Sequence, residues 1–119
     1  MRTEQIRTTL NARYDELTAE YAEALAENHT LRLVETADTA GDDSADSGSK
    51  MAERDTAHYV LRTILERRDQ YAHALARLES GAYGDCETCR EPIPVERLEI
   101  FPAATACVRC QSSRERRAA

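Results

Sequence analysis

Four cysteines are the residues of this 119-residue chain best suited to chemistry, and they form two pairs, Cys86-Glu-Thr-Cys89 and Cys107-Val-Arg-Cys110. Seventeen residues separate the pairs, and the sequence contains no other cysteine. Each Cys-x2-Cys turn presents two thiolates to one ion, and a loop of this length brings two such turns together around a tetrahedral zinc. The spacing therefore predicts one structural Zn²⁺ bound by Cys86, Cys89, Cys107 and Cys110.

Paired cysteines have two other common uses. Two disulfides are typical of small secreted domains, but no apolar signal segment precedes the pairs. A redox Cys-x2-Cys needs one pair and gives no reason for the second. We therefore expect zinc in a reducing, cytoplasmic setting. The apolar runs are too short to cross a membrane, so no membrane association is expected.

Catalytic motifs are missing from the sequence. It has no Gly-rich phosphate loop, no His-Glu-x-x-His motif and no Ser-His-Asp set. Two of the three histidines, His58 and His73, fall in the middle of an expected helix, where we expect them to be solvated or to flank the seam and not to bind a metal. Four cysteine ligands also leave no coordination position for a substrate. We therefore expect a protein that is not an enzyme.

The composition allows only a small core, with one Phe, no Trp, 32% charged residues and a mean hydropathy of −0.65. Such a chain needs a metal or periodic apolar stripes to fold. Residues 3–35 and 50–80 carry such stripes, in steps of three and four that predict two long helices. The expected seam positions are Ile6, Leu10, Tyr14, Leu17, Tyr21, Ala24, Leu25, Asn28, Leu31, Ala57, Leu61, Ile64, Arg68, Tyr71, Leu75 and Leu78.

The expected fold class is mainly α. Residues 36–49 are rich in Gly, Ser and Asp and predict a loop, so the two helices should fold back as an antiparallel coiled-coil hairpin. Arg68 is expected to pack its stem on the seam while its guanidinium reaches an acidic group of the first helix. Residues 1–80 would form the hairpin, with 36–49 as its tip loop, and residues 81–119 a zinc-finger module. We expect a monomer, because the hairpin satisfies its own seam.

Short strands or turns are expected between the cysteine pairs, with a small core behind the metal made by Val95, Leu98, Ile100 and Phe101. The last residues, 111–119, are Arg-rich and predict a short C-terminal helix.

The net charge of −6 lies entirely in residues 1–80, which hold 16 acidic and 10 basic side chains. Residues 81–119 hold six of each. Affinity for a phosphate backbone comes from Lys and Arg, so an acidic rod is a poor DNA ligand. We expect a basic protein cleft as the partner, without sequence-specific DNA binding.

The zinc module resembles the DksA/TraR zinc-finger family. The resemblance rests on the cysteine spacing, the Gly81-Ala-Tyr-Gly84 lead-in, the Arg97-Leu98 pair and the following Pro102. It implies a transcription regulator that binds bacterial RNA polymerase and not promoter DNA. It further implies that the hairpin enters the secondary channel, through which nucleotides reach the active site, while the zinc module stays at the rim.

The resemblance also implies an acidic tip that acts near the polymerase active site. Counted back from Cys86, Asp43 and Asp46 align with the two aspartates of the family motif Asp-x-x-Asp-x-Ala, and Gly48 replaces its alanine. Glycine is more flexible, so the action of the tip is expected to differ. From the residues alone, Asp46 or Ser47 could simply cap the second helix.

Family members that respond to guanosine tetraphosphate (ppGpp) use basic residues at three places. Here those positions are Gln70, Phe101 and Gln111, none of which neutralises a phosphate. The resemblance therefore implies an effect largely independent of this alarmone. Further candidate polymerase contacts, each of which could instead be an ordinary surface charge, are Glu53, Arg54, Arg97, Arg114 and Arg117.

Two other classes of protein remain open from the sequence. The first is a zinc ribbon that binds nucleic acid, which the Arg-rich tail favours and the acidic rod and scarcity of aromatic residues disfavour. The second is a structural coiled-coil adaptor whose hairpin grips another protein.

Overall fold

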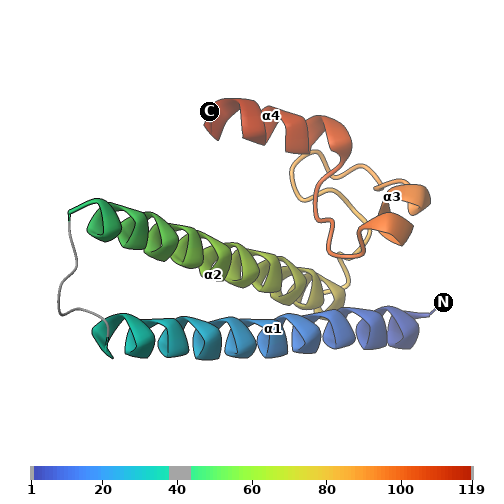
Figure 1. Cartoon of the computed structure of the whole chain (residues 1–119). Coiled ribbons are helices and arrows are strands. Elements are labelled where there is room, and N and C mark those ends of the chain that lie inside the picture. Colours follow the sequence, from blue (N-terminus) through green and yellow to red (C-terminus); the bar gives the residue numbers. More distant parts are fainter. Residues whose placement is uncertain (1, 38–43, 119) are drawn as a thin grey trace. The chain divides into compact units, whose positions relative to one another are not determined.

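Helices make up most of the chain in the computed structural model, which describes residues 2–37 and 44–118, with side chains for residues 2–29 and 51–117. Two long helices, α1 (Thr3–Ala37) and α2 (Ser44–Glu79), precede a short α3 (Val95–Ile100) and α4 (Val108–Ala118). No strand occurs in the described residues; an isolated bridge joins Asp85 and Pro92. The predicted mainly α fold with a C-terminal helix is confirmed (Figure 1).

The predicted tip loop of 36–49 is wrong at both ends. The helix α1 continues to Ala37 and α2 begins at Ser44, so Asp46 and Gly48 lie in the first two turns of α2. The Ser and Asp residues that predicted a loop are also favoured where helices begin, which explains the error. Neither Asp46 nor Ser47 is the residue before the helix, and Asp43 lies outside the described residues.

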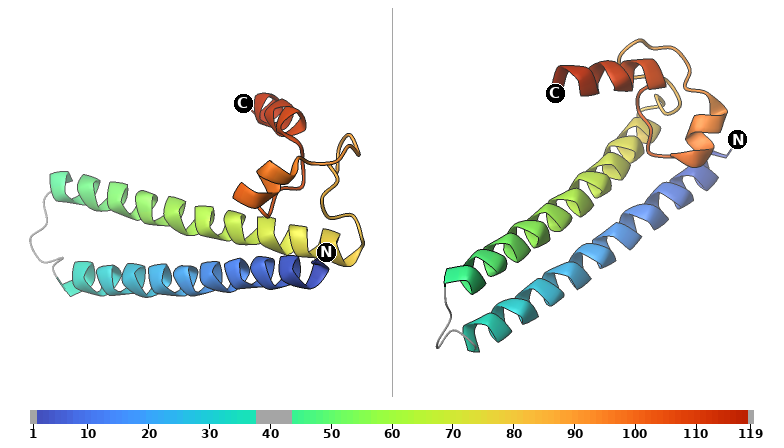
Figure 2. Two further views of the ribbon diagram at one scale, coloured as in Figure 1. Left: turned by 90° about the vertical axis from the view of Figure 1, so that its right-hand side faces the viewer. Right: turned by 45° about the horizontal axis from the view of Figure 1, so that its top comes forward.

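The chain forms two compact units, one of residues 1–15 with 68–119 and one of residues 16–67. The predicted division at residue 80 stays a prediction. In each unit, segments of α1 and α2 run antiparallel side by side (Figures 1 and 2).

Both units are built on the predicted seam. In the unit of residues 16–67, Leu17, Leu61 and Ile64 are buried; in the other unit, Leu10, Tyr71 and Leu78 are buried. Among the described side chains, the seam residue Leu25 is 43% exposed, and the side chain of the predicted seam residue Leu31 lies outside the described ones. The fully buried Ala74 was not among the predicted positions.

Polar contacts reinforce the seam in the unit of residues 1–15 and 68–119. The Arg7 Nε donates to Glu79 Oε1 over 2.9 Å. The guanidinium of Arg68, which is half-buried, lies 5.4 Å from the centroid of the Tyr14 ring, close enough for a cation–π contact. Arg68 thus sits on the seam as predicted, with an aromatic ring of α1 among its partners.

A glycine ends α2 and turns the chain into the zinc module. Gly81 has φ +81°, the left-handed conformation that glycine adopts without strain. The Ala82 N–H donates to the Arg77 carbonyl over 2.8 Å and the Gly81 N–H to the Leu78 carbonyl over 3.2 Å. This pair of bonds is a Schellman motif, which satisfies the last carbonyls of the helix.

Between the cysteine pairs the prediction of strands or turns holds only in part: Pro102 and Ala103 form a turn, but the residues after Pro94 form the helix α3, which was not predicted. Val95 and Ile100 are 65% and 86% exposed, so neither belongs to the core behind the metal. One helical turn can face only one residue inward, and Leu98 takes that place. The rest of this core comes from residues outside α3: Ile93 and Ala106 are buried with Cys86, and Phe101 is only half-buried.

Candidate metal centre

The four predicted cysteines meet at one point. Their Sγ atoms all lie within 4.8 Å of one another, and those of Cys89 and Cys107 are 3.9 Å apart. A zinc ion at about 2.3 Å from each sulfur requires sulfurs about 3.8 Å apart in a tetrahedron. Cys86 is buried and the other three are half-buried, as in a closed structural site. The four cysteines are therefore positioned to bind a single metal ion.

Backbone N–H groups point at the sulfurs in both turns. The N–H groups of Thr88 and Cys89 donate to Cys86 Sγ over 3.4 and 3.5 Å, and that of Cys110 donates to Cys107 Sγ over 3.5 Å. Such donors stabilise the thiolate, which is the form that binds a metal. The same arrangement in two separate turns prepares both for one ion.

The thiol pKa values show why a cation suits this site. Burial raises the pKa of Cys86, but N–H groups of Cys89, Cys107 and Thr88 outweigh it and lower that pKa to about 5. The hydrogen bond with Cys107 raises the pKa of Cys110 to about 12. The low pKa of Cys86 favours its thiolate, whereas the raised pKa of Cys110 shows that a further negative charge is costly beside Cys107, and a divalent ion removes that repulsion.

Loop geometry brings the two turns together. The Cys86 N–H donates to the Glu91 carbonyl over 2.8 Å, and Arg90 adopts φ +68° to close the first turn. The Glu87 N–H donates to the Thr105 carbonyl over 2.8 Å, which ties the first turn to the residues before the second. The helix α4 starts at Val108, so Cys110 lies in its first turn.

The carboxylate of Glu87 collects several partners beside the site. His73 Nε2 lies 2.6 Å from Oε2, and Arg114 lies 2.8 Å from Oε1. Thr105 donates its hydroxyl to Oε1 over 3.2 Å. Burial raises the pKa of Glu87, but the hydrogen bonds from His73 and Arg114 outweigh it, so the pKa lies below its usual range. Glu87 is therefore ionised and is the shared acceptor for these three side chains within the first cysteine turn.

The contacts of Glu87 were not predicted from the sequence. His73 was expected to be solvated or to flank the seam; its side chain is 52% exposed, and its ring also contacts Glu87, 14 residues further along the chain. No spacing pattern announces such a contact, because it depends on how the chain turns after Gly81. The Arg-rich C-terminal segment was the one signal in the sequence for this contact. The helix α4 begins inside the second cysteine pair, so its arginines start close to the first pair.

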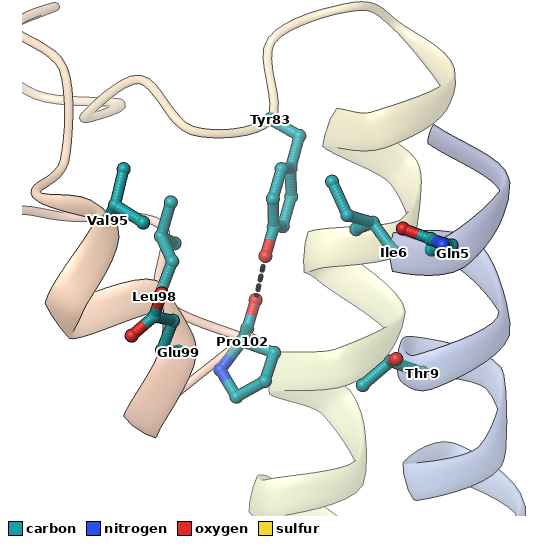
Figure 3. Close-up of a pocket in the computed structure, with 8 residues that line it drawn as sticks. All are labelled: Gln5, Ile6, Thr9, Tyr83, Val95, Leu98, Glu99 and Pro102. Carbon is teal, nitrogen blue, oxygen red and sulfur yellow. Dashed lines mark hydrogen bonds between the residues drawn. The ribbon is translucent and has the colours of Figure 1, made fainter. Parts of the chain in front are cut away.

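A hydrogen bond between Tyr83 and Pro102 links two segments of the zinc module. Figure 3 shows the Tyr83 side chain reaching Pro102, whose carbonyl accepts the phenol hydroxyl over 2.8 Å. Burial raises the pKa of Tyr83. A groove of about 500 Å³ lies beside this bond, lined by Ile6 of α1 and by Val95 and Leu98 of α3.

The structure does not gather the other predicted site residues. Glu53 and Arg54 are exposed on α2 in the unit of residues 16–67. Arg97 donates to the Ala106 carbonyl over 3.2 Å, with its guanidinium 6.0 Å from the Phe101 ring centroid. Arg117 donates to the Ser113 carbonyl over 3.4 Å. These contacts are local, and a role in binding polymerase stays a prediction for all of them.

Two long helices followed by a four-cysteine finger define a class of helical zinc-finger proteins. Residues 81–116 match the family described as the prokaryotic dksA/traR C4-type zinc finger. This segment is therefore similar to the DksA/TraR zinc-finger family, and its four cysteines are positioned as a C4-type zinc finger requires.

Relatives extend the likeness. The chain is 46% identical over 56 residues to "RNA polymerase-binding transcription factor DksA" of Caulobacter vibrioides, a match that spans 47% of this chain and 37% of that protein. It is 32% identical over 89 residues to "General stress protein 16O" of Bacillus subtilis, across 75% of this chain and 55% of that protein. The chain thus spans about half or less of these curated relatives.

A solved structure shows the same fold. Transcription factor DksA2 from Pseudomonas aeruginosa matches with a TM-score of 0.76 and 28% identity, over 98% of this chain and 84% of that one.

None of the helices in the described part of the chain combines the length and the apolar character that a membrane span requires.

Proposed function

We propose that this protein is a non-catalytic transcription regulator that binds bacterial RNA polymerase. The observation that carries the proposal is that one chain combines a dksA/traR-type finger at residues 81–116 with a fold that matches DksA2 over 98% of this chain, long paired helices included. A relative named for binding RNA polymerase supports the choice of partner.

The hairpin is proposed to enter the secondary channel of the polymerase. At 1.5 Å per residue, α1 and α2 are each about 50 Å long, enough to reach deep into such a channel. The excess of acidic side chains in residues 1–80 favours a basic cleft over nucleic acid.

Asp43 and Asp46 are proposed to act at the tip near the catalytic magnesium, where carboxylates can alter the charge around the active site. Gly48, in the second turn of α2, would weaken the start of that helix by about 1 kcal/mol relative to the family's alanine. The tip is therefore proposed to be a less rigid effector than one with alanine.

Any effect on transcription is proposed to be largely independent of ppGpp. Gln70 is exposed on α2, Phe101 is half-buried beside Arg97, and the Gln111 amide donates to Glu115 over 3.2 Å. None brings a positive charge for a phosphate. A transcription assay with increasing ppGpp should show little added effect, and a strong synergy lost in Gln111→Ala would refute this part.

Purified polymerase tests the main proposal. Wild type and Asp43→Ala/Asp46→Ala are compared for binding to the enzyme and for the lifetime of open complexes on a ribosomal promoter. The matched control is Asp55→Ala/Asp69→Ala, which removes two exposed aspartates of α2 away from the tip. We expect all three to bind and only the tip variant to lose the effect on lifetime. Absence of binding by wild type would refute the proposed partner and favour a coiled-coil adaptor.

Nucleic-acid binding is a second candidate, favoured by the exposed Arg109, Arg116 and Arg117 of α4. Against it, Arg114 is already paired with Glu87. A DNA affinity that falls steeply with salt, and falls less steeply in Arg116→Gln/Arg117→Gln, would favour this function.

A further inference from the structure

The first cysteine turn, Cys86-Glu87-Thr88-Cys89, holds α4 at two points. Its outer residues share the metal site with Cys110 of α4. Its inner residues bind Arg114, which lies 2.8 Å from Glu87 Oε1 and donates to Thr88 Oγ1 over 2.8 Å. Cys110 and Arg114 are four residues apart and share one helix face. One tetrapeptide therefore fixes two successive turns of α4.

The same tetrapeptide also holds the end of α2. His73 contacts Oε2 of Glu87 at 2.6 Å, while Arg114 and Thr105 use Oε1. Arg77 of α2 donates to the Asp85 carbonyl over 2.9 Å, just before the turn. The two carboxylate oxygens of Glu87 thus point to two different helices. The Glu87 side chain is 21% exposed, so these contacts are partly shielded from water.

We propose that Glu87 is a latch that couples metal binding in the finger to the positions of α4 and of the C-terminal end of α2. The bound ion fixes the turn between Cys86 and Cys89, and the fixed turn presents both Glu87 oxygens to the helices. Without the ion, the turn loses its fixed shape and the helices lose their shared anchor. The exposed arginines of α4 are then held in place only in the metal-loaded chain.

Convergence on one carboxylate makes this more than a set of surface ion pairs. Isolated exposed pairs contribute little, because each long side chain must be ordered for one contact. Here His73, Arg114 and Thr105 share one partly buried acceptor, and removing it affects all three. Glu87 is a positioning residue: it acts on the helices, while the cysteines bind the ion.

Thermodynamic coupling is reciprocal. If zinc binding strengthens the contacts of Glu87 with the helices, these contacts must strengthen zinc binding by the same factor. A residue that contacts a metal ligand directly contributes about 10–100-fold to metal affinity. The Glu87 side chain contacts none of the four cysteines, so a smaller effect is expected: about three- to tenfold weaker zinc binding for Glu87→Gln. The substitution keeps the shape and removes the charge.

The experiment uses the full chain and Zn²⁺ in competition with a chromophoric chelator, followed by amide hydrogen exchange of residues 111–117 in the zinc-loaded protein. Glu87→Gln should bind zinc more weakly and exchange faster in α4. The matched control, Glu91→Gln, makes the same change at an exposed position of the same loop and should match wild type.

A second variant protects the test against misfolding of the turn. Arg114→Gln leaves the turn of residues 86–89 unchanged and should reproduce both effects, whereas Arg116→Gln, at an exposed position of α4 outside the cysteine turns, should reproduce neither. The proposal would be overturned if Glu87→Gln had the zinc affinity and the α4 exchange of wild type. If Glu87→Gln does not fold, the same result in Arg114→Gln would overturn it. Neither readout involves polymerase, so the outcome is independent of the proposed function.

Discussion

At the scale of single residues, the half-buried Tyr83 shows how one hydrogen bond stabilises the module. Its hydroxyl donates to the Pro102 carbonyl over 2.8 Å. Tyr83→Phe should lower the free energy of unfolding by about 1 kcal/mol, because the carbonyl loses its donor. Urea unfolding of the zinc-loaded protein measures this. Tyr59→Phe, at a 61% exposed ring, is the control and should have no effect.

The same residue predicts a pH dependence. Burial raises the pKa of Tyr83 above its ordinary 10.0, so the folded state favours the neutral phenol. Its contribution is fully present below about pH 10 and is lost as the pH rises through the raised pKa. Wild type should therefore lose more stability than Tyr83→Phe between pH 9 and pH 11. Parallel losses would show that the phenol is not the group responsible.

At the scale of elements, two glycines in α2 and at its end should respond in opposite directions to alanine. Gly48 lies inside the helix, so Gly48→Ala should stabilise the start of α2 by up to about 1 kcal/mol. Gly81 has φ +81°, so Gly81→Ala should destabilise the helix end by about 1–2 kcal/mol. Thermal unfolding followed by circular dichroism compares them. The same sign for both would contradict the backbone conformations described.

The long helices could be predicted because their seams repeat: Leu10, Leu17, Leu61 and Ile64 are buried as the spacing requires. The ends could not, since Ser44 and its neighbours suit a loop and a helix start equally. The finger was predicted at its ligands and only in part at its core. Leu98 packs against the buried cluster as predicted, whereas Ile93 and Ala106 were not foreseen and Ile100 is exposed, because the short helix α3 turns one of its apolar side chains toward the cysteines and not the others.

At the scale of the whole molecule, metal removal should unfold the finger and leave the unit of residues 16–67 folded. The buried cluster of the finger consists of Cys86, Ile93 and Ala106 with the other cysteines against it, so little core remains without the ion. A strong chelator should abolish hydrogen-exchange protection in residues 84–117 while residues 16–29 and 57–67 keep theirs. Protection that persists in the finger would mean that its fold does not depend on zinc.

The hairpin tip is proposed to reach the active site of RNA polymerase. Fe²⁺ in place of the catalytic magnesium of the polymerase reduces added hydrogen peroxide to hydroxyl radicals, which cleave nearby protein. With the end-labelled chain bound to the enzyme, we expect cleavage confined to residues around Asp43 and Asp46. Binding with no cleavage, or cleavage within residues 81–116, would contradict it.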